Sequence, residues 1–357
     1  MNERREGRGM SERDTDAGAP ALPWLPLLPW QRSWAIEVLR GRATFPPALL
    51  LHGPRGIGKH ALALNLAQAL LCEAPRADGL ACGECAGCRY AIRGQHPDLL
   101  RLELATIDDE TGELVAVDTI AIDRVRALID FVQLTSHRQR AKVAVIAPAD
   151  RLNVAAANAL LKTLEEPPPL TYFVLVSAAP SRLPATIVSR CRRLAAPQPT
   201  ADEARAWLAA QGVAEPELVL AEAGGAPLAA LLHADAAFQA ERRAWVAALA
   251  EPDRLFPPLL AARIDAGGRD ERKARLANVI DWLLAWTADL ARVAAGGAAR
   301  QNPDAARPLA TLAGRVAPAA LFRYHRSLTQ QRALAAHPLS PRLVAEAVLI
   351  DYRSLFG

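Results

Sequence analysis

The feature that most constrains the fold is a loop that reads Gly-Pro-Arg-Gly-Ile-Gly-Lys-His at positions 53–60. It matches the phosphate-binding pattern G-x-x-x-x-G-K-[ST] at every fixed position except the last. The apolar run 48–52 precedes it, and residues 59–71 carry apolar side chains at helical spacing. Strand, glycine loop and helix therefore occur in the order that a phosphate-binding loop requires. We expect an α/β P-loop domain with a parallel sheet.

The residues of this loop that could hold phosphate are Gly53, Gly56, Gly58 and Lys59, through backbone N–H groups and the ammonium group. The last position is His60, where the pattern has a hydroxyl that ligates Mg²⁺. Imidazole is a poor ligand for so hard a cation. The residues leave two interpretations open: residual nucleotide binding, or an empty glycine turn that packs a helix on a strand.

A P-loop ATPase also needs acidic residues at the end of a neighbouring strand, where they hold Mg²⁺ and polarise water. Here the apolar run 143–146 is followed by Ala147-Pro148-Ala149-Asp150. Asp150 comes too late, after a proline, and we expect it to cap the next segment. Because both supports for Mg²⁺ are missing, we expect no intrinsic ATPase activity.

Four of the five cysteines form the pattern Cys72-x9-Cys82-x2-Cys85-x2-Cys88. Four thiolates with two x2 spacings suit a closed, tetrahedral Zn²⁺ site, which is structural rather than catalytic. In a reducing cytosol such a pattern indicates metal rather than disulfides, and four neighbouring cysteines argue against a redox pair. The alternative is four free thiols in a loop.

Strand and helix patterns alternate up to about residue 198, and only helical patterns follow. Further strands are expected at 98–104, 142–147 and 171–176, and further helices at 120–134 and 153–164. The expected division is a disordered tail at 1–20, the P-loop domain at 21–198, a small helical domain at 199–240 and a helical domain at 241–357.

The N-terminus is charged and has no apolar core typical of a secretory signal, and either Met1 or Met10 could be the true start. No apolar run approaches the roughly 18 residues that span a bilayer. We therefore expect a cytoplasmic protein. The net charge of +4 does not by itself indicate nucleic-acid binding.

Two further motifs complete the pattern. The run 158–168 reads NALLKTLEEPP, and Ser189-Arg190-Cys191 follows about twenty residues later. On its own, an arginine such as Arg190 is usually a solvated side chain. Together with the P-loop and the four-cysteine insert, however, the two motifs resemble the clamp-loader subunits of bacterial DNA polymerase III, an AAA+ family. The resemblance is strong over 28–200 and weak over the helical remainder.

In that family the motor subunits keep the hydroxyl and the acid pair, whereas delta-prime subunits degrade them, and this chain resembles the delta-prime class. Leu228 also stands where the motor has its sensor-2 arginine. The resemblance implies a non-hydrolysing stator with an AAA+ domain, a small lid domain and a C-terminal collar domain that packs into a ring. It implies that Arg190 acts in trans at the ATP site of a neighbouring motor subunit, during loading of the sliding clamp on primed DNA in chromosome replication.

The partners implied by the resemblance are the motor (gamma/tau) and delta subunits, with the sliding clamp and primed DNA reached through the complex, and no membrane. The chain would belong to a DNA-directed DNA polymerase (nucleotidyltransferase) holoenzyme in the cytoplasm, at the nucleoid-associated replisome. The resemblance gives no basis for ATP or ADP binding by this chain. Two rival interpretations stay open: a clamp-loader-like ATPase that uses Asp150 or another acid, and a zinc-containing nucleic-acid-binding module.

Overall fold

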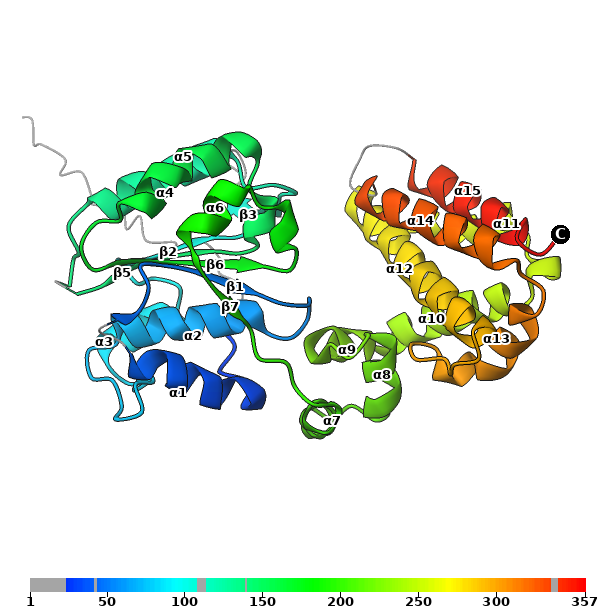
Figure 1. Cartoon of the computed structure of the whole chain (residues 1–357), viewed down its shortest axis with the longest axis horizontal. Helices are drawn as coiled ribbons and strands as arrows, with labels where there is room; N and C mark the ends of the chain where they lie inside the picture. Colours follow the sequence, from blue (N-terminus) through cyan, green and yellow to red (C-terminus); the bar gives the residue numbers. More distant parts are fainter. Residues whose placement is uncertain (1–23, 42–43, 108–113, 139, 335–339) are drawn as a thin grey trace, which may run out of the picture. The chain divides into compact units, whose positions relative to one another are not determined.

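The computed structural model describes residues 24–41, 44–107, 114–138, 140–334 and 340–357. The tail expected at 1–20 lies outside these ranges. The chain divides into two compact units. The first comprises the chain up to Gly53 together with Lys59–Ala196, and the second comprises Pro54–Gly58 together with Pro197–Gly357 (Figure 1). None of the helices in the described part is long and apolar enough to cross a membrane.

The first unit is built on a five-stranded parallel sheet with the strand order β2-β5-β6-β1-β7. These strands are β1 (Ala48–His52), β2 (Leu99–Leu102), β5 (Lys142–Ile146), β6 (Thr171–Ser177) and β7 (Arg192–Ala195). Strands β1, β5 and β6 are buried almost throughout, as expected for a parallel sheet covered on both faces. A separate antiparallel hairpin pairs β3 (Ala105–Ile107) with β4 (Leu114–Ala116).

Helices cover both faces of this sheet (Figure 1). One face carries α1 (Arg32–Arg40), α2 (Lys59–Leu71) and α3 (Ala86–Ile92), and the other carries α4 (Ile122–Gln133), α5 (Val154–Glu165) and α6 (Ala185–Arg190). Eleven of the thirteen residues of α2 are buried, because this helix lies between the sheet and two other helices. The predicted α/β P-loop fold with a parallel sheet is confirmed.

Beyond β7, the described chain consists of helices and their connections. The helices are α7 (Ala201–Ala210), α8 (Pro216–Glu222), α9 (Pro227–His233), α10 (Ala236–Ala250), α11 (Pro257–Ala261), α12 (Arg269–Ala294), α13 (Ala306–Ala313), α14 (Pro318–Leu334) and α15 (Pro341–Arg353). Buried polar contacts join three of them: Trp286 Nε1 donates to Tyr352 Oη (2.8 Å), which donates to the carbonyl oxygen of Leu249 (2.7 Å).

A buried charge network links α8 and α10 to the segment before α13. Arg242 on α10 has a side chain only 2% exposed and lies 2.8 Å from Glu222, the last residue of α8. Its guanidinium also donates to Asp304 (3.0 Å) and to Asn302 (2.9 Å). The buried Asp289 accepts the backbone N–H of Asn302 (2.7 Å), so the same segment is held from two sides.

Candidate functional site

The glycine loop leads from β1 into α2, as the sequence predicts. Gly56 and Gly58 adopt φ angles of 72° and 88°, in the left-handed region that glycine enters without steric cost. Lys59 is the first residue of α2 and is buried. The lysine of the loop therefore lies at the start of the helix that follows it, as the P-loop pattern requires.

Residues 54–58 of the loop group with the second unit, where they contact α9. The backbone N–H of Leu228, in the first turn of α9, donates to the carbonyl oxygen of Gly56 (2.9 Å). A Cβ atom on Gly56 would lie 2.9 Å from the Cβ of Ala226, so this approach requires glycine. Leu228 thus contacts the loop through its backbone.

His60 contacts a carboxylate at the position where the P-loop pattern has a hydroxyl. Its Nε2 lies 2.9 Å from Oε1 of Glu103, the residue that follows β2. Arg101 Nε donates to the same oxygen (2.7 Å), and Arg124 Nη1 donates to the backbone carbonyl of Glu103 (2.6 Å). We call His60, Arg101 and Glu103 the His60–Glu103 cluster.

The carboxylate of this cluster is held in its ionised form. Burial by itself disfavours the charge of Glu103, whose side chain is 10% exposed. The contacts with His60 and Arg101 outweigh that effect, so the pKa of Glu103 lies below its ordinary value. Both partners contact the same oxygen, Oε1, of this carboxylate.

The end of β5 supplies no acid to the loop. The first acidic residue after this strand is Asp150, whose Oδ1 accepts hydrogen bonds from Ser177 Oγ (2.7 Å) and from the backbone N–H of Ala178 (3.1 Å). The expectation that Asp150 caps the next segment is wrong, because Asn153 caps α5 and Asp150 instead fixes the end of β6. Its side chain was misassigned because its partner lies 27 residues away.

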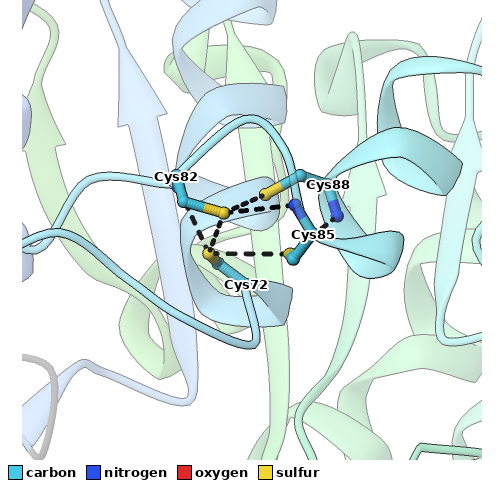
Figure 2. A group of neighbouring side chains, drawn as sticks. All are labelled: Cys72, Cys82, Cys85 and Cys88. Atoms are coloured by element: carbon cyan, nitrogen blue, oxygen red, sulfur yellow. Dashed lines mark hydrogen bonds between the residues drawn. The ribbon is translucent and has the colours of Figure 1, made fainter.

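The four clustered cysteines converge between the end of α2 and the start of α3, with all sulfur atoms within 4.8 Å of one another (Figure 2). The Sγ atom of Cys72 lies 3.6 Å from that of Cys82 and 3.9 Å from that of Cys85. The Sγ atoms of Cys82 and Cys88 are 3.8 Å apart. A tetrahedral Zn²⁺ with bonds of about 2.3 Å requires sulfur–sulfur separations of about 3.8 Å, so the four side chains fit this metal.

Backbone N–H groups point at these sulfur atoms. The amide of Cys85 donates to Cys82 Sγ and that of Cys88 to Cys85 Sγ, both at 3.3 Å. Backbone hydrogen bonds lower the pKa of Cys82 to about 6, whereas burial raises the pKa of Cys72 and of Cys88. A bound dication would favour the thiolate form of all four and hold the loop closed.

Arg190 ends α6 and lies at the surface, with its side chain 30% exposed. Its Nε and Nη2 both donate to Oε2 of Glu165, at 3.1 and 2.9 Å, and its Nη1 donates to the carbonyl oxygen of Thr186 (3.1 Å). Ser189 is exposed beside it, whereas Cys191 is buried, and burial raises the pKa of that thiol to about 11. In this triplet the Arg190 guanidinium lies at the surface, and the buried Cys191 anchors the backbone next to it in the core.

Comparison with known proteins shows the family to which the chain belongs. Residues 38–200 match a family described as DNA polymerase III, delta subunit. DNA polymerase III subunit delta' of Pseudomonas aeruginosa is 41% identical over 274 residues, which are 74% of this chain and 77% of that protein. The chain belongs to the DNA polymerase III delta-prime family. The Escherichia coli delta-prime subunit is 34% identical over 77% of this chain and 78% of its own length.

A second class of subunit matches a shorter part of this chain. DNA polymerase III subunit tau of Bacillus subtilis is 36% identical over 149 residues, which are 42% of this chain and 24% of that protein. The match to the Pseudomonas delta-prime subunit covers 274 residues, more than the first unit contains, so it extends into the helical part. The predicted membership of the delta-prime class is confirmed.

Two residues in these contacts were not singled out as candidate site residues from sequence. Glu103 could have been suspected because it directly follows a parallel strand, and the carboxyl ends of such strands face the binding edge of a sheet. Glu165 lies inside the run that carries the family resemblance, but no local signal pairs it with Arg190, 25 residues later.

Proposed function

We propose that this chain is the non-hydrolysing stator subunit of a DNA polymerase III clamp loader. In this role it supplies Arg190 to the ATP site of a neighbouring motor subunit while the complex loads the sliding clamp on primed DNA in chromosome replication. Family membership supports the general role, since delta-prime relatives match over about three quarters of this chain. The stator role and the action of Arg190 are the parts that experiment must decide.

The observation that carries the proposal is the 2.9 Å contact between His60 and Glu103. Phosphoryl transfer by a P-loop protein depends on a hydroxyl that ligates Mg²⁺ and on an acid that holds the ion. Here an imidazole takes the place of the hydroxyl, and the carboxylate of Glu103 lies within hydrogen-bond distance of it. Asp150 is engaged at the end of β6, which argues against the rival interpretation of an ATPase that uses this acid.

Arg190 supports a role in trans. An arginine supplied by one subunit to the γ-phosphate of its neighbour stabilises transition-state charge and can raise turnover by 10³–10⁵. Such a residue must be at the surface and held in one orientation, and Arg190 is part-exposed with three of its N–H groups engaged. The site that it completes would belong to the motor subunit.

The remaining parts of the proposal concern metal, partners and location. Cys72, Cys82, Cys85 and Cys88 would hold a structural Zn²⁺, which adds no chemistry but fixes the insert. The partners would be the motor (gamma/tau) and delta subunits, and through them the clamp and primed DNA. The chain would act in the cytoplasm within a nucleotidyltransferase holoenzyme. Nucleotide binding by Gly53, Gly56, Gly58 and Lys59 is not part of the proposal.

The proposal is tested by mixing the purified chain with motor and delta subunits. We expect a stable complex that hydrolyses ATP when clamp and primed DNA are added, and no hydrolysis by the chain alone. Magnesium-dependent turnover by the chain alone would favour the ATPase alternative. Failure to form the complex, together with DNA binding that weakens steeply with salt, would favour the nucleic-acid-binding module.

A further inference from the structure

The contact between Glu165 and Arg190 joins the ends of two helices. Glu165 is the last residue of α5 and Arg190 is the last residue of α6. Leu164 and Ile187, which precede them on these helices, are buried in one hydrophobic cluster. Packing of the core therefore sets where the two helix ends lie, and the ion pair fixes only the direction of the arginine side chain.

The guanidinium of Arg190 is only partly engaged by these contacts. Glu165 accepts from Nε and Nη2, and Thr186 accepts from Nη1. A guanidinium has five N–H donors in a rigid fork, so two N–H groups on the Nη atoms are left for a further acceptor. A phosphate oxygen from outside the chain could accept them without displacing Glu165.

Local energetics do not explain why a carboxylate stands at position 165. The C-terminal end of a helix carries partial negative charge, which disfavours a carboxylate in the last turn. Glu165 is also 60% exposed, and an exposed ion pair contributes little to folding. Its contribution therefore lies in restricting a long side chain, since an arginine held in one rotamer loses less conformational entropy when it contacts a ligand.

We propose that Glu165 is a positioning residue that holds the Arg190 guanidinium in the orientation in which it meets the γ-phosphate at the ATP site of the neighbouring motor subunit. This inference rests on the proposed function, because it requires Arg190 to act in trans. It assigns to Glu165 no contact with the nucleotide. Its effect on turnover must therefore pass entirely through Arg190.

The test uses the reconstituted loader with clamp and primed DNA, and four variants of this chain: Glu165→Gln, Arg190→Ala, the double variant and Glu166→Gln. Glu166 is the matched control, because it is the exposed neighbour of Glu165 and, within the described residues, its carboxylate makes no ion pair. We expect Arg190→Ala to lower the kcat for ATP at least tenfold. Glu165→Gln should lower it about two- to fivefold with KM unchanged, and Glu166→Gln should have no effect.

The double variant decides whether Glu165 acts through the arginine. It should turn over ATP at the rate of Arg190→Ala alone, because without the arginine there is nothing for Glu165 to orient. If Arg190→Ala slows turnover but Glu165→Gln does not, or if the double variant is slower than Arg190→Ala, the positioning role is wrong and the proposed function stands. If Arg190→Ala has no effect, the role in trans and this inference both fall.

A second measurement does not need the loader. In the isolated chain, the Nε–H of Arg190 should give a slowly exchanging NMR signal that Glu165→Gln broadens or shifts and Glu166→Gln leaves unchanged. An Nε–H signal that is the same with and without Glu165 would overturn the inference, even if turnover changed. Equal melting temperatures of the two glutamine variants would show that both are folded.

Discussion

At the scale of single residues, Glu103 is the hydrogen-bond acceptor for His60, the last residue of the glycine-loop motif. Its carboxylate is largely buried and accepts from His60 (2.9 Å) and Arg101 (2.7 Å). A buried carboxylate without partners would be strongly destabilising, and these contacts offset its desolvation.

Replacing Glu103 by Gln should lower the free energy of unfolding by about 1–3 kcal/mol at pH 7, because Arg101 and His60 lose their charged acceptor. The pKa of Glu103 lies below its ordinary value, so this contribution is present above about pH 4.5 and is lost as the pH falls through the folded-state pKa. Denaturant unfolding at pH 7 and pH 4 should show a smaller gap between wild type and variant at pH 4. A difference in unfolding free energy of equal size at both pH values would contradict this account. Glu166→Gln is the control and should show little difference from wild type at either pH.

Restoring the hydroxyl at position 60 should not create an ATPase. In His60→Thr the loop matches the P-loop pattern in full, but β5 still ends without an acid and Asp150 is still bound to Ser177. Phosphate release by the isolated variant should therefore stay at background with Mg²⁺ present. Clear magnesium-dependent release would mean that an acid elsewhere in the chain serves the site.

At the scale of elements, the cysteine insert is a turn and a short helix closed by side chains. The Sγ atom of Cys85 caps the N-terminus of α3 by accepting the N–H of Cys88, in addition to the metal-binding role proposed for it. Serine caps helices well but is a poor zinc ligand, so Cys85→Ser separates the two roles. Because the serine keeps the helix cap, any difference between Cys85→Ser and the wild type reports on metal binding rather than on the cap.

We expect the purified chain to contain about one Zn²⁺, and Cys85→Ser or chelation to release it. Hydrogen exchange should then rise in residues 72–92 while the helices α12–α15 keep their protection and assembly with the motor subunits persists. Cys191→Ala, which removes the cysteine outside the cluster, should retain the metal. Loss of the whole complex in Cys85→Ser would contradict a purely local role for the zinc.

The buried charge network around Arg242 should contribute strongly to the stability of the second unit. Arg242→Ala leaves the buried Glu222 without its ion-pair partner, and burial raises the pKa of that carboxyl. Breaking such a pair typically costs about 3–5 kcal/mol. The exposed neighbour Arg243 provides the control, and Arg243→Ala should change stability by less than about 0.5 kcal/mol. Thermal melting of the full chain compares the two variants. Equal melting temperatures of Arg242→Ala and Arg243→Ala would contradict the structural role of Arg242.

The same elements show what the sequence could and could not predict. β5 and β6 were predictable because a buried parallel strand is an uninterrupted apolar run. β7 was missed because it lies at the sheet edge and exposes Arg192 and Arg193, so no apolar pattern marks it. Arg242 could not be distinguished from a solvated arginine, since its partners lie about 20 and 60 residues away. The clustering of the four cysteines was predictable because Cys82, Cys85 and Cys88 are close in sequence.

At the scale of the whole molecule, the two units serve different parts of the proposed role. The first contains the His60–Glu103 cluster, the cysteine site and Arg190, and the second is a helical unit organised around α12. In the first unit the glycine loop ends in His60 in place of a hydroxyl, and Asp150 accepts hydrogen bonds at the end of β6. In the proposed role, the ATP site belongs to the neighbouring motor subunit, and this chain contributes to it the arginine that is held at its surface.

The most direct test of this account is ATP turnover by the loader reconstituted with wild type, Arg190→Ala or Arg190→Lys, in the presence of clamp and primed DNA. We predict a fall of at least tenfold with alanine and incomplete rescue with lysine, which keeps the charge but loses the guanidinium fork. The chain alone should be inactive in all three forms. Normal turnover by the Arg190→Ala loader, or hydrolysis by the isolated chain, would contradict the account.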